Sequence, residues 1–202
     1  MNTLRFALTF VLTILACNSF SESIDENKNR TINKKFGFVL NSMRLNDETA
    51  IKNNLGNKMQ SYGIYGQVEK STGLLLGAGF GILDFDDHGE YEVAVSYGGS
   101  NSYFGEDATA QGFNFYGYAG YQHRIKNFGA DVTTGFELIR AERTVTNCSD
   151  CPSEDLDIDA GLYIKPRIGY KFGETWGLDL TYTYYVNSDI DNNIGLELTL
   201  IR

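Results

Sequence analysis

Apolar and polar side chains alternate along most of the chain after residue 34. In the closing stretch "NNIGLELTLIR", Leu196, Leu198 and Leu200 share one phase, whereas Glu197 and Thr199 share the other. A period of two residues is typical of a β-strand with two unlike faces. No comparable stretch of the chain has the 3.6-residue period of a capped amphipathic helix. The pattern predicts an all-β fold with eight strands, over residues 35–45, 59–70, 74–85, 110–124, 129–141, 157–171, 176–187 and 193–201.

The joints between these strands alternate in length. Short stretches, "STG", "IKNF" and "FGET", join strands two to three, four to five and six to seven, and the other four joints are long, polar and acidic. Such alternation is typical of outer-membrane barrels, which have tight turns at one end and long loops at the other. The segment Glu90 to Gly98 also alternates, and we expect it to form part of a hairpin within the second long loop. A ten-stranded barrel that uses Asn101 to Gly105 is the alternative.

One face of the predicted strands carries bulky apolar side chains, and the other face is mixed, with many glycines and polar residues. In the sixth strand, for example, Ile158, Ala160 and Leu162 alternate with Asp159 and Gly161. The interior of an eight-stranded barrel is only wide enough for side chains to fill. The bulky face is therefore predicted to point outward, toward lipid. A soluble β-sandwich that buries this face is the alternative.

Aromatic residues gather beside the short joints, at Tyr121, Phe128, Tyr170, Phe172 and Trp176. In membrane barrels, girdles of aromatic residues mark the two interfaces. We therefore expect these side chains to lie at the membrane interface beside the short turns. The alternative reading is that aromatic residues simply favour strands.

The first residues have the features of a secretory signal peptide. "MNTLR" carries one positive charge, "FALTFVLTILAC" is apolar but short for a membrane span, and polar "NSFSES" follows. Cleavage is predicted after Ser21, so residues 1–21 form the signal peptide, 22–34 a flexible leader and 35–202 the barrel domain. The alternative is cleavage before Cys17, because "ILAC" approximates the recognition sequence of a lipoprotein.

The signal peptide, the eight amphipathic strands, the alternating joints and the leucines of the last strand together resemble the small outer-membrane barrels of the OmpA and OmpX type. The resemblance covers about residues 35–202 and implies an antiparallel up-and-down transmembrane barrel in the bacterial outer membrane. It implies a monomer without catalytic activity that acts in envelope structure or adhesion. Its expected partners are outer-membrane lipid, lipopolysaccharide, the outer-membrane assembly machinery and a host-surface ligand of the loops. Arg202 takes the place of the terminal Phe typical of this group.

Charge narrows the possible functions. The formal net charge of −9 argues against a nucleic-acid partner, which requires concentrated Lys and Arg. Charges in a narrow, low-dielectric lumen must be paired, so we expect Lys165 and Arg167 to bind carboxylates of neighbouring strands and plug the lumen. The alternative is a narrow cation-preferring channel, because acidic residues outnumber basic ones. The charged residues predicted on the inward face are Glu69, Asp131, Glu137, Asp159, Lys165, Arg167, Asp179 and Glu197.

Two loop motifs carry residues with possible further chemistry, a pair of cysteines and a run of aspartates. Cys148 and Cys151, in "TNCSDCPSEDLD", are predicted to form a disulfide because an exported protein meets an oxidising compartment. A redox centre is the less favoured reading, since no helix N-terminus is expected nearby to stabilise a thiolate. The spacing of the following aspartates fails the EF-hand pattern, because Ala160 replaces the turn glycine and Pro166 the bidentate glutamate. The sequence predicts no metal site and no cofactor.

An enzyme that modifies lipid A is a further hypothesis, and it would use a histidine base. The chain has two histidines, His88 and His123, and neither is followed by Ser two residues later, as in lipid A deacylases. We therefore predict no catalytic site.

Overall fold

The computed structural model describes residues 32–87, 90–97, 100–145 and 153–201, and for residues 90–97 and 100–107 it describes the backbone alone. The predicted signal peptide, most of the leader, the two loop cysteines Cys148 and Cys151, His88 and Arg202 lie outside these residues.

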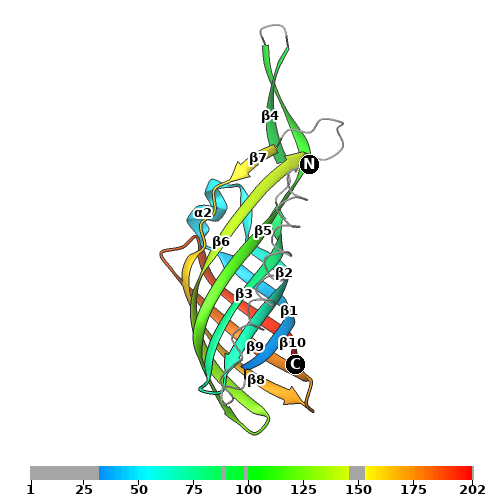
Figure 1. The fold of residues 1–202 in the computed structure, drawn as a ribbon. Coiled ribbons are helices and arrows are strands. Elements are labelled where there is room, and N and C mark those ends of the chain that lie inside the picture. Colours follow the sequence, from blue (N-terminus) through cyan, green and yellow to red (C-terminus); the bar gives the residue numbers. More distant parts are fainter. Residues whose placement is uncertain (1–31, 88–89, 98–99, 146–152, 202) are drawn as a thin grey trace, which may run out of the picture.

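Eight strands form a closed antiparallel barrel (Figure 1). They follow the order β1, β2, β3, β5, β6, β8, β9 and β10 around the ring, and β10 pairs with β1 to close it. The predicted strand number is therefore confirmed, and a sandwich is excluded because the sheet closes on itself. The bounds are β1 Ile32–Leu45, β2 Leu55–Lys70, β3 Leu74–Asp87, β5 Ser100–Ile125, β6 Phe128–Val145, β8 Gly161–Phe172, β9 Trp176–Val186 and β10 Ile190–Ile201.

Two further strands lie outside the ring. β4 (Glu90–Tyr97) pairs with the first part of β5, and β7 (Ser153–Leu156) pairs with the last part of β6. The β4–β5 hairpin rises beyond the barrel at the upper end of the view (Figure 1). The prediction that Glu90 to Gly98 belongs to a hairpin of the second loop is confirmed for the described residues 90–97, and the ten-stranded barrel is wrong.

The two ends of the barrel differ. We call the end with the three short turns, at residues 71–73, 126–127 and 173–175, the turn end, and the opposite end the loop end. Gly73, Lys126 and Gly173 in these turns have positive φ angles of 88°, 55° and 62°, as tight hairpin turns require. In outer-membrane barrels the short turns face the periplasm and the longer loops face outward.

In the described part of the loop end, one short helix, α2 (Asp47–Lys52), lies between β1 and β2. Asn46 caps it by accepting a hydrogen bond from the backbone N–H of Thr49 at 2.7 Å. Among the described residues, no helix is long and apolar enough to cross a membrane. The fourth joint at this end was predicted to be long, but β10 begins at Ile190 and leaves only residues 187–189 between β9 and β10. The strand starts early because Ile190, 2% exposed, packs into the core of the barrel.

The outer surface is apolar over the middle of the barrel. Side chains such as Leu138, Leu162 and Ile168, each more than 60% exposed, cover it, as expected of a lipid-facing wall. Toward the loop end, this apolar surface ends at a belt of exposed polar residues, each of which is paired with the next on the neighbouring strand. The residues of this polar belt are Ser42, Gln60, Asp84, Gln111 and Glu142. The outward direction of the bulky face is therefore confirmed for most strands, and the belt marks the edge of the lipid zone toward the loop end.

The interior has two halves of different chemistry. Toward the loop end the lumen holds a packed apolar core, and toward the turn end it holds charged, amide, hydroxyl and tyrosine side chains. The apolar half was not predicted, because the alternation had assigned bulky side chains only to the outer face. Its members include Met43, Leu45, Leu55, Met59, Leu83, Phe85, Ile158 and Ile190.

Candidate functional site: the polar half of the lumen

Arg167 is the centre of the charge network. It projects inward from β8 and is 3% exposed. Its Nε donates to Asp131 Oδ2 on β6 at 2.8 Å, and its Nη1 donates to Glu197 Oε2 on β10, also at 2.8 Å. Its Nη2 donates to the side-chain oxygen of Gln67 on β2 at 2.8 Å. One guanidinium therefore joins four strands across the lumen, through hydrogen bonds of the strong charge-assisted kind.

Glu197 accepts from a second cation. Lys165 Nζ lies 3.0 Å from Glu197 Oε1 and over the faces of Tyr116 and Tyr118, 5.6 and 5.0 Å from the ring centroids. A cation above an aromatic face is attracted by the ring quadrupole. Lys165 and Arg167 both engage carboxylates, and with the tyrosine rings they occupy the middle of the lumen.

Lys35 is a third inward cation, which was not among the predicted charges of the lumen. Its Nζ lies 2.7 Å from Glu69 Oε2 and donates to Gln122 Oε1 at 3.1 Å. The signal was present in the sequence, because Lys35 has the same phase as buried Val39 and the opposite phase to exposed Phe36. It was overlooked because Lys35 stands at the first predicted strand position, next to the assumed leader.

Glu137 lies deeper in the barrel, and its bonds are to neutral groups. Asn114 Nδ2 donates to one of its oxygens, and Tyr185 Oη donates to the other at 2.6 Å. No described Lys, Arg or His lies within ion-pair distance of it. Glu137 borders a cavity of about 20 Å³ together with Lys165 and Tyr163, which is enough space for about one water molecule.

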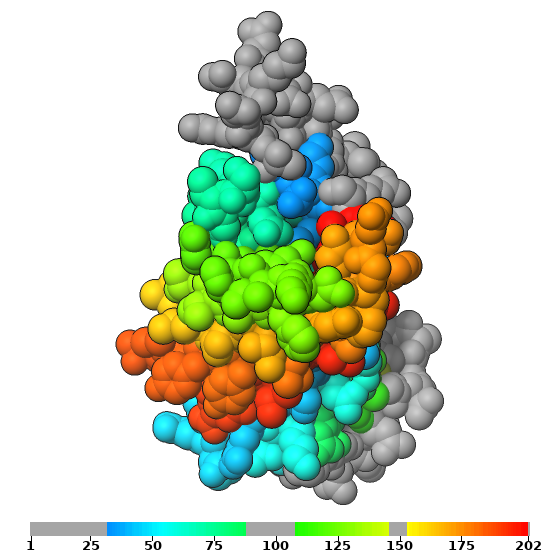
Figure 2. All heavy atoms as spheres, turned by 90° about the horizontal axis from the view of Figure 1, so that it is seen from below, coloured from blue at the N-terminus to red at the C-terminus, as the bar shows by residue number. Residues whose placement is uncertain are grey.

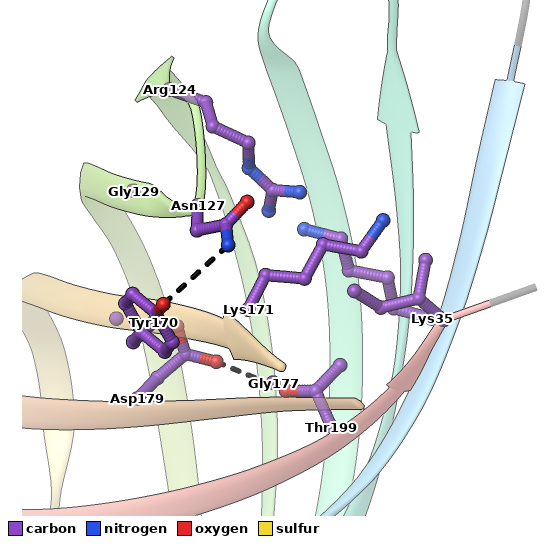
Figure 3. A pocket seen from close by; sticks show the side chains of 11 residues that line it. Lys35, Arg124, Asn127, Gly129, Tyr170, Lys171, Gly177, Asp179 and Thr199 are labelled. Atoms are coloured by element: carbon purple, nitrogen blue, oxygen red, sulfur yellow. Dashed lines mark hydrogen bonds between the residues drawn. The ribbon is translucent and has the colours of Figure 1, made fainter. Parts of the chain in front are cut away.

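Asp179 lies at the mouth of the lumen at the turn end. It accepts a hydrogen bond from Thr199 Oγ1 at 3.0 Å and borders a cavity of about 10 Å³. Figure 3 shows Lys35, Arg124 and Lys171 reaching into the same pocket. Three cations and Asp179 therefore line the mouth, and one of these cations, Lys35, is paired with Glu69.

The prediction for Asp159 is wrong. Its side chain is exposed, and the residue lies before β8 in the loop, where its backbone accepts from Ser188 Oγ at 2.9 Å. The cause is Gly161, whose φ of 81° shifts the alternation by one residue. Ile158 and Ala160 consequently point inward and are buried, although the sequence pattern assigned them to lipid.

A second network ties the loops together. Arg143 on β6 is 4% exposed, pairs with Asp87 and Glu154 at 3.2 and 2.7 Å, and donates to the backbone carbonyls of Asn53 and Asn54. It was not singled out from the sequence because it follows the predicted end of its strand.

On the outer side of the loops, Lys52 on α2 binds Asp157 at 2.6 Å. The hydrogen bond and the opposite charge raise the pKa of Lys52 and lower the pKa of Asp157. Both groups are exposed, so the pair is expected to contribute little to stability.

The predictions about metal and disulfide chemistry stay predictions. Among the residues that the structure describes, no group of three or more His, Cys, Asp or Glu side chains is arranged to hold a metal ion. The disulfide between Cys148 and Cys151 falls outside these residues and stays a prediction.

The family is shown by comparison with protein-family models. The model described as "Outer membrane protein beta-barrel domain" matches residues 35–200. The chain belongs to this family. Its place as an outer-membrane β-barrel protein of the OmpA and OmpX type in the bacterial outer membrane is thereby confirmed, and the soluble periplasmic alternative is wrong. No curated protein sequence matches the chain.

Solved structures of other outer-membrane β-barrel proteins align with this chain. Ail, the attachment invasion locus protein of Yersinia pestis, aligns with a TM-score of 0.50 at 11% identity over 85% of this chain and 97% of Ail. Neisserial surface protein A aligns with a TM-score of 0.46 at 10% identity over 86% and 97% of the two chains. The N-terminal barrel domain of OprF from Pseudomonas aeruginosa gives 0.45 at 12% identity, over 85% and 97%. At these identities the likeness concerns the fold alone.

Proposed function

We propose that this outer-membrane β-barrel protein is a non-catalytic, monomeric scaffold. Its lumen is closed, and its loop end forms an acidic platform that acts in envelope structure or surface interaction. The main support for a closed lumen is that Arg167 pairs with both Asp131 and Glu197. These ion pairs span the interior between strands of the ring.

The two halves of the lumen support closure in different ways. In the turn-end half, the ion pairs and tyrosines leave the two cavities described above, each with space for about one water molecule. In the loop-end half, apolar side chains such as Met43, Leu83 and Ile190 are at most 2% exposed. A hydrated ion would have to displace both layers, so this arrangement favours a scaffold over the narrow cation-preferring channel.

The lack of catalysis is part of the same proposal. His123 is exposed at the turn end of β5, in phase with the lipid-facing Tyr121 and Ile125. A general base acts within hydrogen-bond reach of the proton that it removes, usually inside a pocket. His123 lies at the turn end, on the periplasmic side, whereas lipid A lies in the outer leaflet near the loop end, so His123 is out of reach of that substrate. His88 lies outside the described residues.

The loop end is acidic, and this determines which partners suit it. Residues 84–107 contain seven Asp or Glu and no Lys or Arg, and residues 146–159 contain five Asp or Glu and no Lys or Arg. A surface of one sign attracts partners of the opposite sign and repels those of its own. We infer that the loop partner, on a host surface or in the envelope, presents cationic groups to this platform.

A polyanionic ligand fits the platform poorly. A solved structure of Ail contains the heparin analogue sucrose octasulfate, and that binding is a property of Ail. In this chain, we propose that only the few basic side chains near the polar belt contact the phosphates of lipopolysaccharide. Arg44 and Lys58, which are exposed and lie opposite each other on β1 and β2, are the candidates.

The platform is tested by binding to immobilised polylysine and to immobilised heparin at low salt. The purified protein in nanodiscs is expected to bind polylysine and not heparin. Replacing Asp86, Asp155 and Asp191 together by Asn should weaken polylysine binding about tenfold or more, as follows from the loss of three charges near a charged surface. The matched control replaces the same residues by Glu, keeps the charge, and should bind as the native protein does. Equal binding of both variants, or preferential binding of heparin, would contradict the acidic platform.

A further inference from the structure

The turn end carries charge of the opposite sign to the loop end. Five cationic side chains lie at or near its surface, on β1, β2, β5, the β5–β6 turn and β8: Lys34, Lys70, Arg124, Lys126 and Lys171. Among the described carboxylates of this end, Glu174 is exposed, Asp179 lies at the mouth of the lumen, and Glu69 is paired with Lys35. We call these five cationic side chains the basic rim. It lies at one end of a chain whose net charge is −9.

The basic rim lies beside the aromatic side chains that mark the membrane interface. Phe128 packs edge-on against Tyr170 at 4.9 Å between ring centroids, and Tyr170 packs in the same way against Phe172, also at 4.9 Å. Lys171 stands between Tyr170 and Phe172 in the sequence, and Lys126 stands two residues before Phe128. Aromatic residues settle at headgroup level, so the cations reach the same level or just beyond it.

We propose that the basic rim binds the anionic headgroups of phospholipids in the periplasmic leaflet. The cations are distributed around the circumference, as the strand order β1, β2, β5–β6 turn and β8 shows. Seen from the turn end, the β5–β6 and β8–β9 hairpins lie over different parts of this face (Figure 2). Cations spread around the barrel can each contact a different lipid molecule of the surrounding membrane, whereas one soluble ligand would contact only a few of them.

The physical effect is attraction between Lys or Arg and a negatively charged membrane surface. It would hold the turn end at the periplasmic surface while the acidic loop end stays in the aqueous phase outside. The inference concerns the turn end only, so it does not depend on the closed lumen or on the partner of the loops.

The test uses Trp176, which is the single Trp of the chain and belongs to the same aromatic girdle. It is 47% exposed and pairs with Phe172, the neighbour of Lys171. The native protein is refolded into phosphatidylcholine vesicles that contain either brominated phosphatidylglycerol or brominated phosphatidylcholine at the same mole fraction. Bromine on the acyl chain quenches a nearby indole, so the ratio of quenching gives the local enrichment of the anionic lipid. We expect enrichment of about threefold or more at low salt, falling toward one in 1 M NaCl because salt screens the charges.

Two charge variants separate the basic rim from the general charge of the protein. The rim variant replaces four of the five rim cations, Lys34, Lys70, Lys126 and Lys171, by Gln, and it should lose most of the enrichment. The control variant replaces four cations of the loop end, Arg44, Lys52, Lys58 and Arg140, by Gln, and it should keep the native enrichment. Retained enrichment in the rim variant, or equal loss in the control variant, would overturn the proposal.

Two measurements on the native protein keep the proposal testable even if the rim variant fails to refold. Equal quenching by the two brominated lipids at low salt would overturn it. Adding inorganic phosphate at constant ionic strength should leave the enrichment unchanged. A selective loss of enrichment in phosphate would indicate a discrete phosphate site and would also overturn the proposed lipid binding.

Discussion

Arg167 and Glu197 form an ion pair across the lumen from strands that are not neighbours. β9 separates β8 from β10, yet Arg167 Nη1 lies 2.8 Å from Glu197 Oε2. The residues are 3% and 1% exposed. The pair therefore crosses the interior and holds two strands together that share no backbone hydrogen bonds, so we expect it to stabilise the barrel.

Replacing Arg167 by Met should strongly destabilise the barrel. The change removes the cation shared by Asp131 and Glu197 and leaves buried negative charge. Breaking a buried ion pair by removing one partner costs about 3–5 kcal/mol. The measurement is urea unfolding in lipid vesicles, followed by the fluorescence of Trp176. Arg140→Met, at an exposed position on the outer face of β6, is the control and should change the free energy of unfolding by about 0.5 kcal/mol or less.

If the destabilisation by Arg167→Met arises from unpaired buried charge, a second substitution that removes a carboxylate should restore part of the lost stability. Adding Glu197→Gln to Arg167→Met removes one of the stranded carboxylates, so the double variant should be more stable than the sum of the single changes predicts, by about 1–3 kcal/mol. Strictly additive changes would show that the two residues do not act as a pair.

The tyrosines of the lumen require glycine on the facing strand. A Cβ at Gly79 on β3 would overlap the ring of Tyr116, whereas a Cβ at Gly66 on β2 would meet no atom within 4 Å. Gly79→Ala should therefore lower the free energy of unfolding by about 1–3 kcal/mol, the usual cost of overpacking. Gly66→Ala should be neutral or slightly stabilising, because Ala reduces the freedom of the unfolded chain. Equal effects of the two substitutions in urea unfolding would contradict a tightly filled lumen.

Arg143 should control the order of the loops rather than the integrity of the barrel. Arg143→Met removes the common partner of Asp87, Glu154 and two backbone carbonyls. Hydrogen bonds to a charged group contribute about 2 kcal/mol, so amide exchange in residues 47–54 and 153–156 should become about thirtyfold faster. The amides of β8 to β10 should keep their protection. Arg44→Met is the control, because the ion pairs of Arg44 are half exposed, and the prediction fails if both variants open the loops equally.

The parts of the fold that follow a period of two could be predicted from the sequence. The outward leucines of β10, the three short turns and the inward positions of Lys165 and Arg167 all follow from that alternation. The β4–β5 hairpin was also predictable, because its segment alternates between two long polar stretches. The local pattern was sufficient to predict which side chains point inward wherever the alternation continues without a shift along the whole strand.

The remaining features depend on geometry that the pattern does not contain. Gly161 reverses the phase of the chain before β8, and only its φ angle reveals this. The apolar core at the loop end forms because β1, β2 and β3 extend past the polar belt, where inward Met43 and Met59 become register partners. The partner of Arg167 on β10 is set by the tilt and stagger of the strands around the ring, which a single sequence does not specify.

The most direct measurement of the closed lumen is conductance in planar lipid bilayers. The purified native barrel should insert, as judged by its heat-modifiable migration in detergent gels, and yet give no steady current steps in 1 M KCl. Bilayers that contain it should be as insulating as lipid alone. Reproducible, long-lived current steps with a preference for cations would contradict the closed lumen and would favour the narrow channel instead.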